Sequence, residues 1–443
     1  MNLYRRGMEK VNFLTLGCKV NQYETEAMQE LFKKKGYKIC NNDEICDIYV
    51  INTCTVTNLS DRKSRQFISK AKKLNKDAIL AVVGCYSQIA PDEISKIDDV
   101  DVIIGTKNRN KIVELCEEAK KSNIKFNIVS ELTKDCGFDV LSIDNQESKT
   151  RAYIKVQEGC NMFCTYCIIP YARGPIKSRP LDDIYKEAKK LSENGYKEII
   201  ITGIHVGSYG LDLDENISLI DVIEKISTIE KIDRIRLSSI EAGIISYNFL
   251  QRLKNCKKVC EHFHLSLQSG CDKILKLMNR RYTTKMYKQK VSMIREIFPN
   301  VALTTDIIVG FPEETDEDFN ETLEFVKDIG FSKIHVFKYS PRKGTPAFDF
   351  KNQVDGNIKK IRSTNLILLS KEMTTKYLQE KLSQKHEVLF EENSNGNRLT
   401  GYTRNYIRFN IPYCEGMKNK VVYCSGLSVE GEEMFGFPTK VKV

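Results

Sequence analysis

Short apolar runs alternate with amphipathic stretches along the first 121 residues. The apolar runs lie at 11–17, 47–52, 78–84 and 102–104. Strands that alternate with helical patterns in this way indicate a parallel sheet with helices on its faces. We therefore expect an N-terminal open parallel α/β sheet over residues 9–121, followed by a polar connector over 122–145.

A second series of strand and helix patterns begins near residue 152. Six consecutive βα units predict a partial (β/α)6 barrel, which we place within a domain over residues 146–376. A single long amphipathic pattern, typical of a helix, then covers 358–384. The apolar runs of the series lie at 152–157, 198–202, 234–239, 262–268, 303–309 and 333–339.

The period of the pattern changes again near His386. Short alternating strands follow, and Asn-Gly and Glu-Gly pairs mark turns between them. This pattern is typical of a small all-β barrel, expected here as an OB-like domain over residues 377–443. The fold class is therefore α/β, with an all-β domain at the C-terminal end.

The composition adds one unusual feature, which is 15 cysteines in 443 residues without a tryptophan. A chain of this length forms a core without disulfides, so metal or redox chemistry in a reducing compartment is favoured over a secreted disulfide scaffold. Apolar runs are shorter than the ~20 residues of a membrane helix, and the stretch before Cys18 is shorter than the ~7–15 residues of a signal core. We expect a cytoplasmic protein without a membrane segment. The net charge of +10 is compatible with nucleic-acid binding and equally with ordinary solubility.

Three cysteines, Cys160, Cys164 and Cys167, lie in one octapeptide, Cys-Asn-Met-Phe-Cys-Thr-Tyr-Cys. Their spacing fits a loop around one metal centre. A structural zinc site needs four protein ligands, and after this loop the next histidine is His205. A 4Fe-4S cluster held by three cysteines leaves one iron open for chemistry, and the loop follows the first strand of the barrel, at the end where active sites lie. The alternative is three unligated loop cysteines.

Three more cysteines, Cys18, Cys54 and Cys85, each follow a predicted strand of the N-terminal sheet. The carboxyl ends of parallel strands meet at one edge of a sheet, where open α/β sheets bind ligands. Helix N-termini after the cysteines favour an anionic group there. This placement predicts a second cluster, whereas the alternative is buried structural cysteine.

The octapeptide and the six βα units resemble the radical S-adenosylmethionine (SAM) superfamily. Two three-cysteine sites and a β-barrel tail resemble its methylthiotransferases, which consist of a methylthiotransferase N-terminal domain, a radical SAM domain and a TRAM domain. The resemblance covers essentially the whole chain. Lys-Val after Cys18 and Tyr-Ala-Arg-Gly at 171–174 resemble the MtaB-type branch, with one departure, Val206, where Leu is expected. The segments that carry the resemblance to this branch are 17–24, 167–174, 203–207 and 280–282.

The resemblance implies that a methylthio group replaces the C2 hydrogen of N6-threonylcarbamoyladenosine at position 37 of tRNA, with two SAM molecules and two 4Fe-4S clusters. Such a C–H bond has no acidic proton and no leaving group, so acid–base or nucleophilic catalysis does not make it react. We therefore expect no catalytic residues beyond the cluster ligands. The alternatives are a MiaB-like enzyme for isopentenyladenosine, a RimO-like enzyme for a ribosomal protein, and a non-catalytic iron–sulfur RNA-binding redox sensor. The implied partners are the anticodon stem-loop of tRNA and a flavodoxin- or ferredoxin-type electron donor, and we expect a monomer.

The resemblance also assigns residues at the strand ends to SAM. These are Gly203, Ser239, Glu241, Gln268, Gly310 and Tyr339. Asn21 and Asn52 are candidates for hydrogen bonds around the sulfurs of the second cluster, although turn or capping roles explain them equally well.

Interleaved aromatic and arginine residues near the C-terminal end predict RNA contacts by stacking and charge. The alternative is an ordinary barrel with core aromatics and solvated arginines. We also expect contacts from Arg173 and Lys177 after the octapeptide, and from a basic helix. The candidates at the C-terminal end are Tyr402, Arg404 and Arg408, and those of the helix are Arg62, Lys63, Arg65, Lys70, Lys72 and Lys73.

Overall fold

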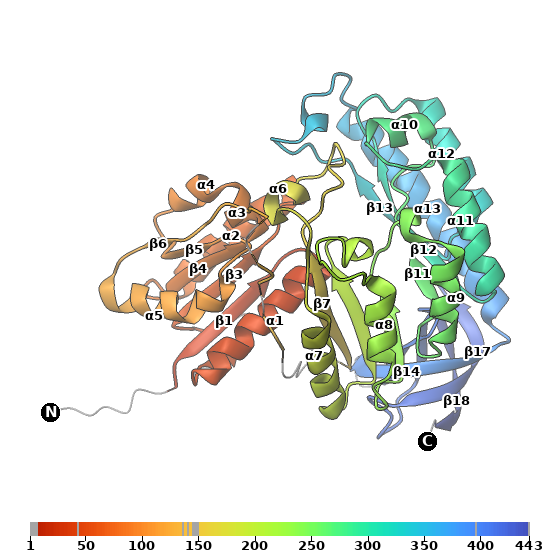
Figure 1. The fold of residues 1–443 in the computed structure, drawn as a ribbon, viewed down its shortest axis with the longest axis horizontal. Coiled ribbons are helices and arrows are strands. Elements are labelled where there is room, and N and C mark those ends of the chain that lie inside the picture. Colours follow the sequence, from red (N-terminus) through yellow and green to blue (C-terminus); the bar gives the residue numbers. More distant parts are fainter. Residues whose placement is uncertain are drawn as a thin grey trace.

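The computed structural model describes residues 8–41, 44–134, 137–139, 141–143, 150–394 and 397–441. It consists of an N-terminal α/β domain, a central half-barrel and a small C-terminal barrel (Figure 1). The expected fold class is confirmed.

The N-terminal domain has a parallel sheet with strand order β2-β1-β3-β4-β5-β6. The central strands β3 and β4 are buried along their whole length, which explains why they are apolar apart from Asn52 and Thr53 at the end of β3. β2 and β6 are short edge strands that the sequence analysis did not predict, and β6 lies inside the expected connector. The strands are β1 (Lys10–Thr15), β2 (Lys38–Cys40), β3 (Ile48–Thr53), β4 (Ile79–Gly84), β5 (Val102–Ile104) and β6 (Phe126–Asn127). The helices are α1 (Lys19–Lys34), α2 (Asn58–Leu74), α3 (Cys85–Ile89), α4 (Pro91–Ser95), the 3-10 turn η1 (Arg109–Lys111) and α5 (Ile112–Ser122).

The central domain has the six parallel strands that the sequence predicts. They form two sheets, β10-β9-β7 and β11-β12-β13, which single β-bridges at Ile235 and Ile240 join into one open half-barrel. A short antiparallel strand, β8 (Lys177–Ser178), is added beside β7. The parallel strands are β7 (Arg151–Glu158), β9 (Glu198–Gly203), β10 (Arg234–Leu237), β11 (His262–His264), β12 (Ala302–Val309) and β13 (Lys333–Lys338). The helices and 3-10 turns are α6 (Ile169–Arg173), α7 (Leu181–Glu193), η2 (Val206–Ser208), α8 (Leu219–Ser227), η3 (Ala242–Ile244), α9 (Tyr247–Asn255), α10 (Asp272–Leu277), α11 (Thr284–Ile297), α12 (Asp316–Ile329) and η4 (Pro346–Phe348).

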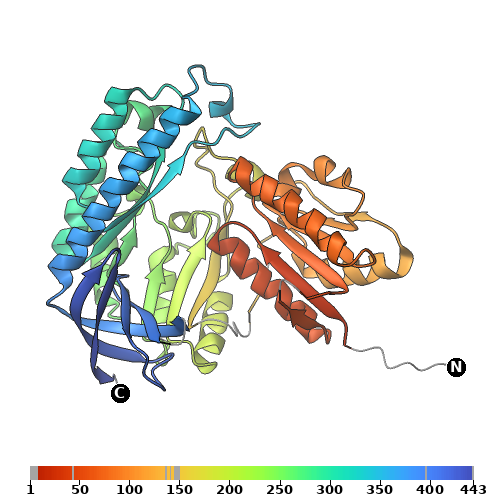
Figure 2. The ribbon, with the colours of Figure 1, turned by 180° about the vertical axis from the view of Figure 1, so that it is seen from behind.

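One long helix, α13 (Gly356–Lys381), packs on β13 and leads into the C-terminal barrel, as the view from behind shows (Figure 2). The expected domain boundary after residue 376 lies inside this continuous helix. The barrel closes in the order β14-β15-β16-β18-β17 around an apolar core, so the predicted all-β domain is confirmed. Its strands are β14 (Lys385–Ser394), β15 (Arg398–Thr403), β16 (Arg408–Pro412), β17 (Val421–Glu430) and β18 (Glu433–Val441).

Buried arginines fix the C-terminal barrel to the N-terminal ends of the half-barrel strands. Arg234 donates hydrogen bonds to the backbone oxygens of Glu387 at 2.6 Å and Tyr402 at 2.8 Å. Arg236 pairs with Glu198 at 2.7 Å. Burial opposes ionisation of Glu198, but Arg236 and Arg151 outweigh it and lower the pKa of that carboxyl to about 2. The small barrel is therefore held in one place by charge-assisted bonds rather than by apolar packing alone.

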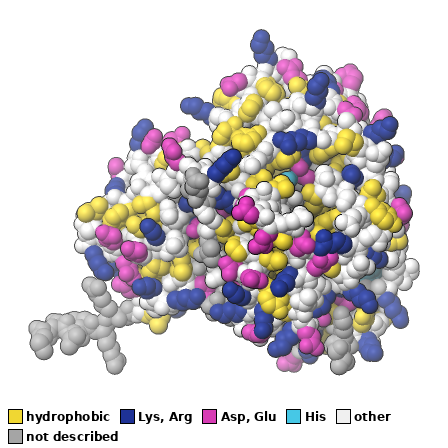
Figure 3. Space-filling view, viewed as in Figure 1, with side chains coloured by type: hydrophobic (Ala, Val, Ile, Leu, Met, Phe, Trp, Pro, Cys, Tyr) yellow, Lys and Arg dark blue, Asp and Glu magenta, His cyan; other side chains and the backbone are white. Residues whose placement is uncertain are grey.

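The molecular surface in Figure 3 carries basic and acidic side chains that are interspersed over this face. Within the described residues, the helices include none that is both long and apolar enough to cross a membrane. Charge of both signs is distributed over this face.

Candidate active site

The octapeptide loop lies at the C-terminal end of β7 and is held by backbone contacts. The amide of Cys160 donates to the oxygen of Gly174 at 3.0 Å, and Thr165 donates from its amide to Met278 and from its hydroxyl to Leu277. Gly159 has a φ of +73°, and a Cβ there would lie 1.9 Å from the oxygen of Pro175. The loop is thus closed at its base by a contact that only glycine permits.

A row of charged side chains in contact with one another extends from this loop into the half-barrel. Arg280 donates to Sγ of Cys164 at 3.2 Å and pairs with Glu241 at 2.5 Å. Glu241 in turn lies 3.1 Å from Nε2 of His205. Burial opposes ionisation of Glu241, but His205 and Arg280 hold its pKa below the usual value. A cation therefore lies directly beside a cysteine sulfur.

The second set of cysteines comes together at the carboxyl edge of the N-terminal sheet, as predicted from strand position. Cys18 caps α1 and Cys85 begins α3. A glycine precedes each of these two cysteines, Gly17 with a φ of +105° and Gly84 with +101°. A Cβ on Gly17 would lie 2.7 Å from Cβ and 2.9 Å from Sγ of Cys54. The glycines therefore allow the three turns to approach one another closely.

Asn21 joins two of the cysteine-bearing turns. Its amide nitrogen donates to the oxygens of Leu16 and Thr53, both at 2.8 Å, which immediately flank the turns of Cys18 and Cys54. The Cys18 thiol also lies 3.8 Å from Oδ1 of Asn21. Asn52 instead donates to the backbone oxygen of Asn21 at 2.8 Å. Asn21 thus organises the site itself, and Asn52 supports Asn21.

Arg173 corrects an expectation, because its side chain is fully buried and does not face RNA. Its Nε donates to Sγ of Cys85 at 3.2 Å and its Nη2 donates to Oδ1 of Asn21 at 2.6 Å. Its Nη1 also pairs with Glu24 at 2.5 Å and with Glu158 at 2.6 Å. Lys177, expected beside it at a substrate phosphate, is 4% exposed on β8. Both cations belong to the interior of the interface between the first two domains.

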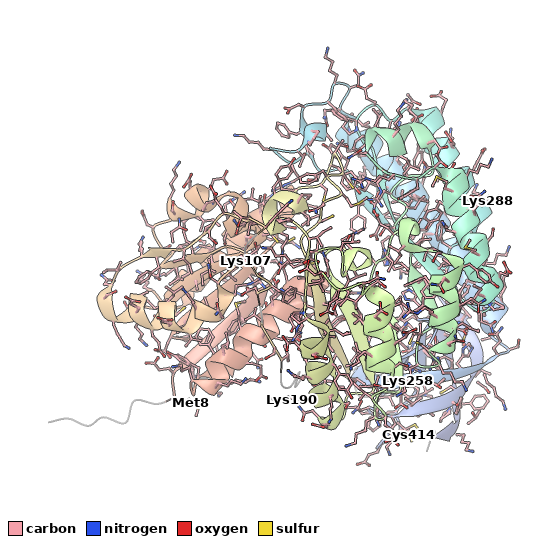
Figure 4. The ribbon with its side chains drawn as sticks, in the orientation of Figure 1. Met8, Lys107, Lys190, Lys258, Lys288 and Cys414 are labelled. Atoms are coloured by element: carbon pink, nitrogen blue, oxygen red, sulfur yellow. The ribbon has the colours of Figure 1, made fainter. Side chains whose placement is uncertain are left out.

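The partners of Arg173 form a buried ion-pair cluster that joins α1, η1 and β7. Burial opposes ionisation of Glu158, but Lys155, Arg173 and Arg109 hold its pKa well below the usual value. Burial similarly opposes ionisation of Glu24, and Arg109, Arg173 and Lys155 lower its pKa. We refer to the following six groups as the interface ion cluster: Glu24, Arg109, Asp139, Lys155, Glu158 and Arg173. Lys107, labelled in Figure 4 where the N-terminal domain meets the half-barrel, lies beside them, and burial lowers its pKa to about 8.

A cavity of about 880 Å³ is lined by the octapeptide cysteines and by one cysteine of the second set. Cys18 and its neighbour Lys19 line it from the N-terminal domain, and all three cysteines of the octapeptide line it from the half-barrel. Residues of the C-terminal barrel line it as well, among them Tyr402 and Tyr406. All three domains therefore contribute residues to one cavity.

The strand-end residues that the resemblance assigns to SAM divide into two groups. Gly203, Ser239, Glu241 and Gln268 line the cavity. Gly310 and Tyr339 do not: the amide of Gly310 donates to Glu314 at 2.8 Å, and the ring of Tyr339 packs on Phe311 at 5.4 Å between centroids. The last two strand ends therefore do not belong to the lining of the cavity.

The RNA-binding candidates of the C-terminal barrel also differ from one another. Tyr402 stacks on Tyr406 at 4.8 Å, with the guanidinium of Arg151 over its ring, and it lines the cavity. Arg408 lines the cavity as well and pairs with Glu433 at 2.9 Å. Arg404 donates to the backbone oxygens of Lys257 and Val259 and so fastens the barrel to the half-barrel.

The basic helix predicted to contact RNA is α2. Most of its basic residues are exposed, and four of them, Arg62, Arg65, Lys70 and Lys73, line a shallow depression on the helix surface. Lys72 instead donates to the backbone oxygen of Ala78 at 2.8 Å. The helix therefore presents a basic face of the kind that the prediction requires.

Three of the six thiols are poorly suited to act as free nucleophiles. Burial raises the pKa of Cys160 to about 11 and that of Cys167 to about 12. Burial also raises the pKa of Cys85 to about 12, and the charge of Arg173 opposes this rise. Such thiols are protonated at neutral pH unless a metal displaces the proton. Cys414, by contrast, is exposed on the outer surface of the C-terminal barrel (Figure 4).

The sequence analysis missed several residues that shape the site. Arg280 was noted only as part of a motif, and Lys155, Glu158 and Arg236 were not considered. Arg280 follows α10, whereas Lys155, Glu158 and Arg236 lie within strands β7 and β10, where a charge is unexpected because lysine, glutamate and arginine are rarely buried unless paired. A charge inside an apolar strand pattern is the signal that identifies such residues.

Comparisons with known proteins agree with this geometry. Residues 154–326 match the Radical SAM superfamily, and residues 10–105 match the uncharacterized protein family UPF0004. A solved structure of the radical SAM methyltransferase TsrM from Kitasatospora setae, with cobalamin and a [4Fe-4S] cluster bound, shares the fold with a TM-score of 0.58 at 12% identity over 77% of each chain. The half-barrel and its cysteine loop thus define a radical SAM enzyme.

Relatives that match over most of their length identify the family within this class. The chain is 42% identical to the threonylcarbamoyladenosine tRNA methylthiotransferase MtaB of Bacillus subtilis (strain 168), over 94% of this chain and 93% of that protein. It is 40% identical to the MtaB of Aquifex aeolicus (strain VF5), over 90% and 95%. It is 35% identical to the tRNA-2-methylthio-N(6)-dimethylallyladenosine synthase of Alkaliphilus oremlandii (strain OhILAs), over 98% and 94%. The chain belongs to the radical SAM methylthiotransferase family.

Enzymes of this family use SAM and two 4Fe-4S clusters, and both cysteine sets fit such groups. Each set offers three thiols, and in each set one sulfur accepts a hydrogen bond from a buried arginine at 3.2 Å. Buried guanidinium groups suit an anionic cluster, which would otherwise lie uncompensated in a region of low dielectric. The octapeptide cysteines and Cys18 also line the cavity that four of the six predicted SAM residues line.

Proposed function

We propose that this enzyme replaces the C2 hydrogen of N6-threonylcarbamoyladenosine, next to the anticodon at position 37 of tRNA, with a methylthio group. The observation that carries this proposal is a cavity lined by the three octapeptide cysteines, by Cys18 of the second set and by residues of the C-terminal barrel. When bound, SAM and the clusters supply the radical chemistry that an unreactive aromatic C–H bond requires. The relatives named MtaB support the choice of nucleoside.

The two cysteine sites would have different roles. Cys160, Cys164 and Cys167 would hold one cluster, and the adjoining strand ends would position SAM. Cys18, Cys54 and Cys85 would hold the other cluster on the opposite side of the same cavity. A nucleoside between the two sites would be shielded from water by the C-terminal barrel, where the stacked pair Tyr402 and Tyr406 offers an aromatic surface for a base.

The charge of the cavity favours the threonylcarbamoyl group over a dimethylallyl group. The first carries a carboxylate, whereas the second is apolar. Among the described lysines and arginines that line the cavity, Lys19 is the one without an ion-pair partner. Its position next to Cys18 would place the ammonium group beside a nucleoside that faces the second cluster. The four other basic side chains pair as follows: Arg236 with Glu198, Arg280 with Glu241, Lys333 with Glu432 and Arg408 with Glu433.

Binding of the anticodon stem-loop would use surface cations outside the cavity. The exposed basic face of α2 follows the turn of Cys54 and so lies close to the cluster site. Phosphate contacts of this kind give affinity without reading sequence. We further propose that the enzyme works as a cytoplasmic monomer and receives electrons from a flavodoxin- or ferredoxin-type donor.

The decisive experiment uses reconstituted full-length protein and three tRNA substrates, which carry threonylcarbamoyladenosine, isopentenyladenosine or unmodified adenosine at position 37. After reaction with SAM and a reductant, the nucleosides are analysed by mass spectrometry. We expect a methylthio product from the first substrate only. A product from isopentenyladenosine would assign the MiaB-type reaction instead, and RNA binding without SAM cleavage would favour the redox sensor. The RimO-type alternative is tested with ribosomal protein in place of tRNA.

A further inference from the structure

Arg173 belongs to the chain segment that links the two cysteine sites. It ends α6, six residues after Cys167, yet its side chain crosses into the N-terminal domain and donates to Sγ of Cys85. The next residue, Gly174, accepts a hydrogen bond from the amide of Cys160 at 3.0 Å. The side chain of Arg173 thus contacts the second cysteine site, and the backbone of Gly174 contacts the octapeptide site.

The position of Arg173 is determined by more than one bond. Its guanidinium donates at once to Cys85, Asn21, Glu24 and Glu158, so its planar fork is held in a single orientation. Asn21 in turn holds the turns of Cys18 and Cys54. The helices α3 and α6, which carry Cys85 and Arg173, also pack on each other. A shift of α6 would therefore be transmitted to the second cysteine set.

We propose that Arg173 is a positioning residue for the cluster of Cys18, Cys54 and Cys85, which it stabilises by its charge and fixes relative to the octapeptide loop. This inference rests on the proposed assignment of a second cluster. A cationic hydrogen-bond donor on a cysteine sulfur stabilises an anionic cluster and influences its reduction potential. Arginine is suited to this role because it remains charged when buried and binds several acceptors in one plane.

The interface ion cluster provides a matched control. Arg109 is as fully buried as Arg173 and also pairs with Glu24 and Glu158. Its other contacts are with Asp139 and the oxygen of Thr106. Among the described contacts of Arg109 there is none with a cysteine. Arg109→Lys and Arg173→Lys therefore disturb the same carboxylates, but only the second removes a hydrogen bond from Cys85.

The test measures iron retention and redox behaviour without tRNA. Wild-type, Arg173→Lys and Arg109→Lys chains are reconstituted anaerobically, and we expect about eight irons per wild-type chain for two 4Fe-4S clusters. On addition of a chelator, Arg173→Lys should lose the iron of its second site about 10-fold faster than wild type or more. Its EPR-monitored reduction potential at that site should shift downward, and SAM cleavage should remain within about twofold. Arg109→Lys should retain iron like wild type.

Equal iron loss in the two variants would overturn the proposal, because the effect would then come from the ion pairs. Wild-type retention in Arg173→Lys would overturn it too. If Arg173→Lys does not fold, two charge-balanced double variants repeat the comparison. They are Arg173→Gln/Glu24→Gln and Arg109→Gln/Glu24→Gln, and only the first should lose iron. A wild-type chain with only four irons would refute the second cluster and with it this inference. If the tRNA assay failed but iron retention differed as expected, the role of Arg173 would be supported and only the proposed nucleoside substrate would be refuted.

Discussion

The two cysteine sites perform related tasks with opposite architectures. The octapeptide site is local: one loop of eight residues supplies all three sulfurs, and backbone hydrogen bonds close it. The second site is distributed, because each sulfur comes from a different βα unit of the sheet. Both share an arginine at 3.2 Å from one sulfur, but Arg280 comes from the same domain as its cysteine and Arg173 from another. A local site depends on its loop, whereas a distributed site depends on the arrangement of whole domains.

The largest expected effect separates the two sites by function. Cys164→Ala should lower SAM cleavage to 5′-deoxyadenosine more than 100-fold. Cys85→Ala should leave that cleavage within several-fold of wild type but abolish formation of the methylthio nucleoside. Chromatography of the SAM products and mass spectrometry of the tRNA nucleosides measure the two activities in one reaction. Equal loss of SAM cleavage in both variants would mean that the sites do not act separately.

The next effect tests the close approach of the cysteine-bearing turns. Gly17→Ala introduces a side chain at a φ of +105° and within 2.9 Å of the Cys54 sulfur. We expect a loss of about 2 kcal/mol or more in the free energy of unfolding, and loss of iron from the second site only. Chemical denaturation and iron analysis provide the measurements.

Gly36→Ala is the control for Gly17→Ala, since Gly36 has a φ of +88° but open space around its Cβ position. It should cost about 1 kcal/mol of backbone strain and leave iron binding unchanged. If both variants kept full iron content, the close contact would not be needed for the site.

A smaller effect concerns substrate choice at the distributed site. Lys19→Met removes a charge of the cavity but keeps a long side chain. We expect kcat/KM for the threonylcarbamoyl substrate to fall about 10-fold or more, as for loss of one charged hydrogen bond, while iron content stays constant. Lys333→Met is the control, because Lys333 pairs with Glu432 and should change kcat/KM less than about threefold. A similar loss in both variants would remove the special role of Lys19.

The smallest effect is expected at the local site. Arg280→Lys removes the hydrogen bond to Cys164, but the loop remains closed by the bonds of Thr165 and of Asn279, whose side chain donates to Phe163 at 3.0 Å. Chelator-induced iron loss should therefore rise less than about threefold, compared with about 10-fold for Arg173→Lys. An equal or larger effect at Arg280 would contradict the distinction between local and distributed sites.

Sequence patterns predicted the features that depend on local order. The strand β4 is entirely apolar and is followed directly by Cys85, so its place in the sheet and the place of the cysteine follow from one pattern. The six strands of the half-barrel and the closed C-terminal barrel were predicted for the same reason. The short edge strands β2 and β6 were not, because three- and two-residue strands leave no period to detect.

Contacts across domains explain the remaining errors. Arg173 and Glu24 are 149 positions apart, so nothing near Arg173 in the chain indicates that it is buried. The same holds for Arg404, which contacts the half-barrel 145 and 147 positions away. Gly310 and Tyr339 follow strands as predicted, but packing on Phe311 decides which way Tyr339 faces. Strand position therefore predicts where a residue lies and not what its side chain meets.

The interface ion cluster has a consequence for the exchange of domains between related enzymes. Glu24 comes from the N-terminal domain, and two of its partners, Lys155 and Arg173, come from the half-barrel. A chimera whose foreign N-terminal domain lacks this carboxylate would bury two cations with too little negative charge, and loss of one partner of a buried pair costs about 3–5 kcal/mol. A chimera with a foreign N-terminal domain should therefore fold and bind iron only when that domain carries Glu24, Asn21 and Arg109 as well as the three cysteines. Recombination at the domain boundary is thus restricted by residues that are not ligands.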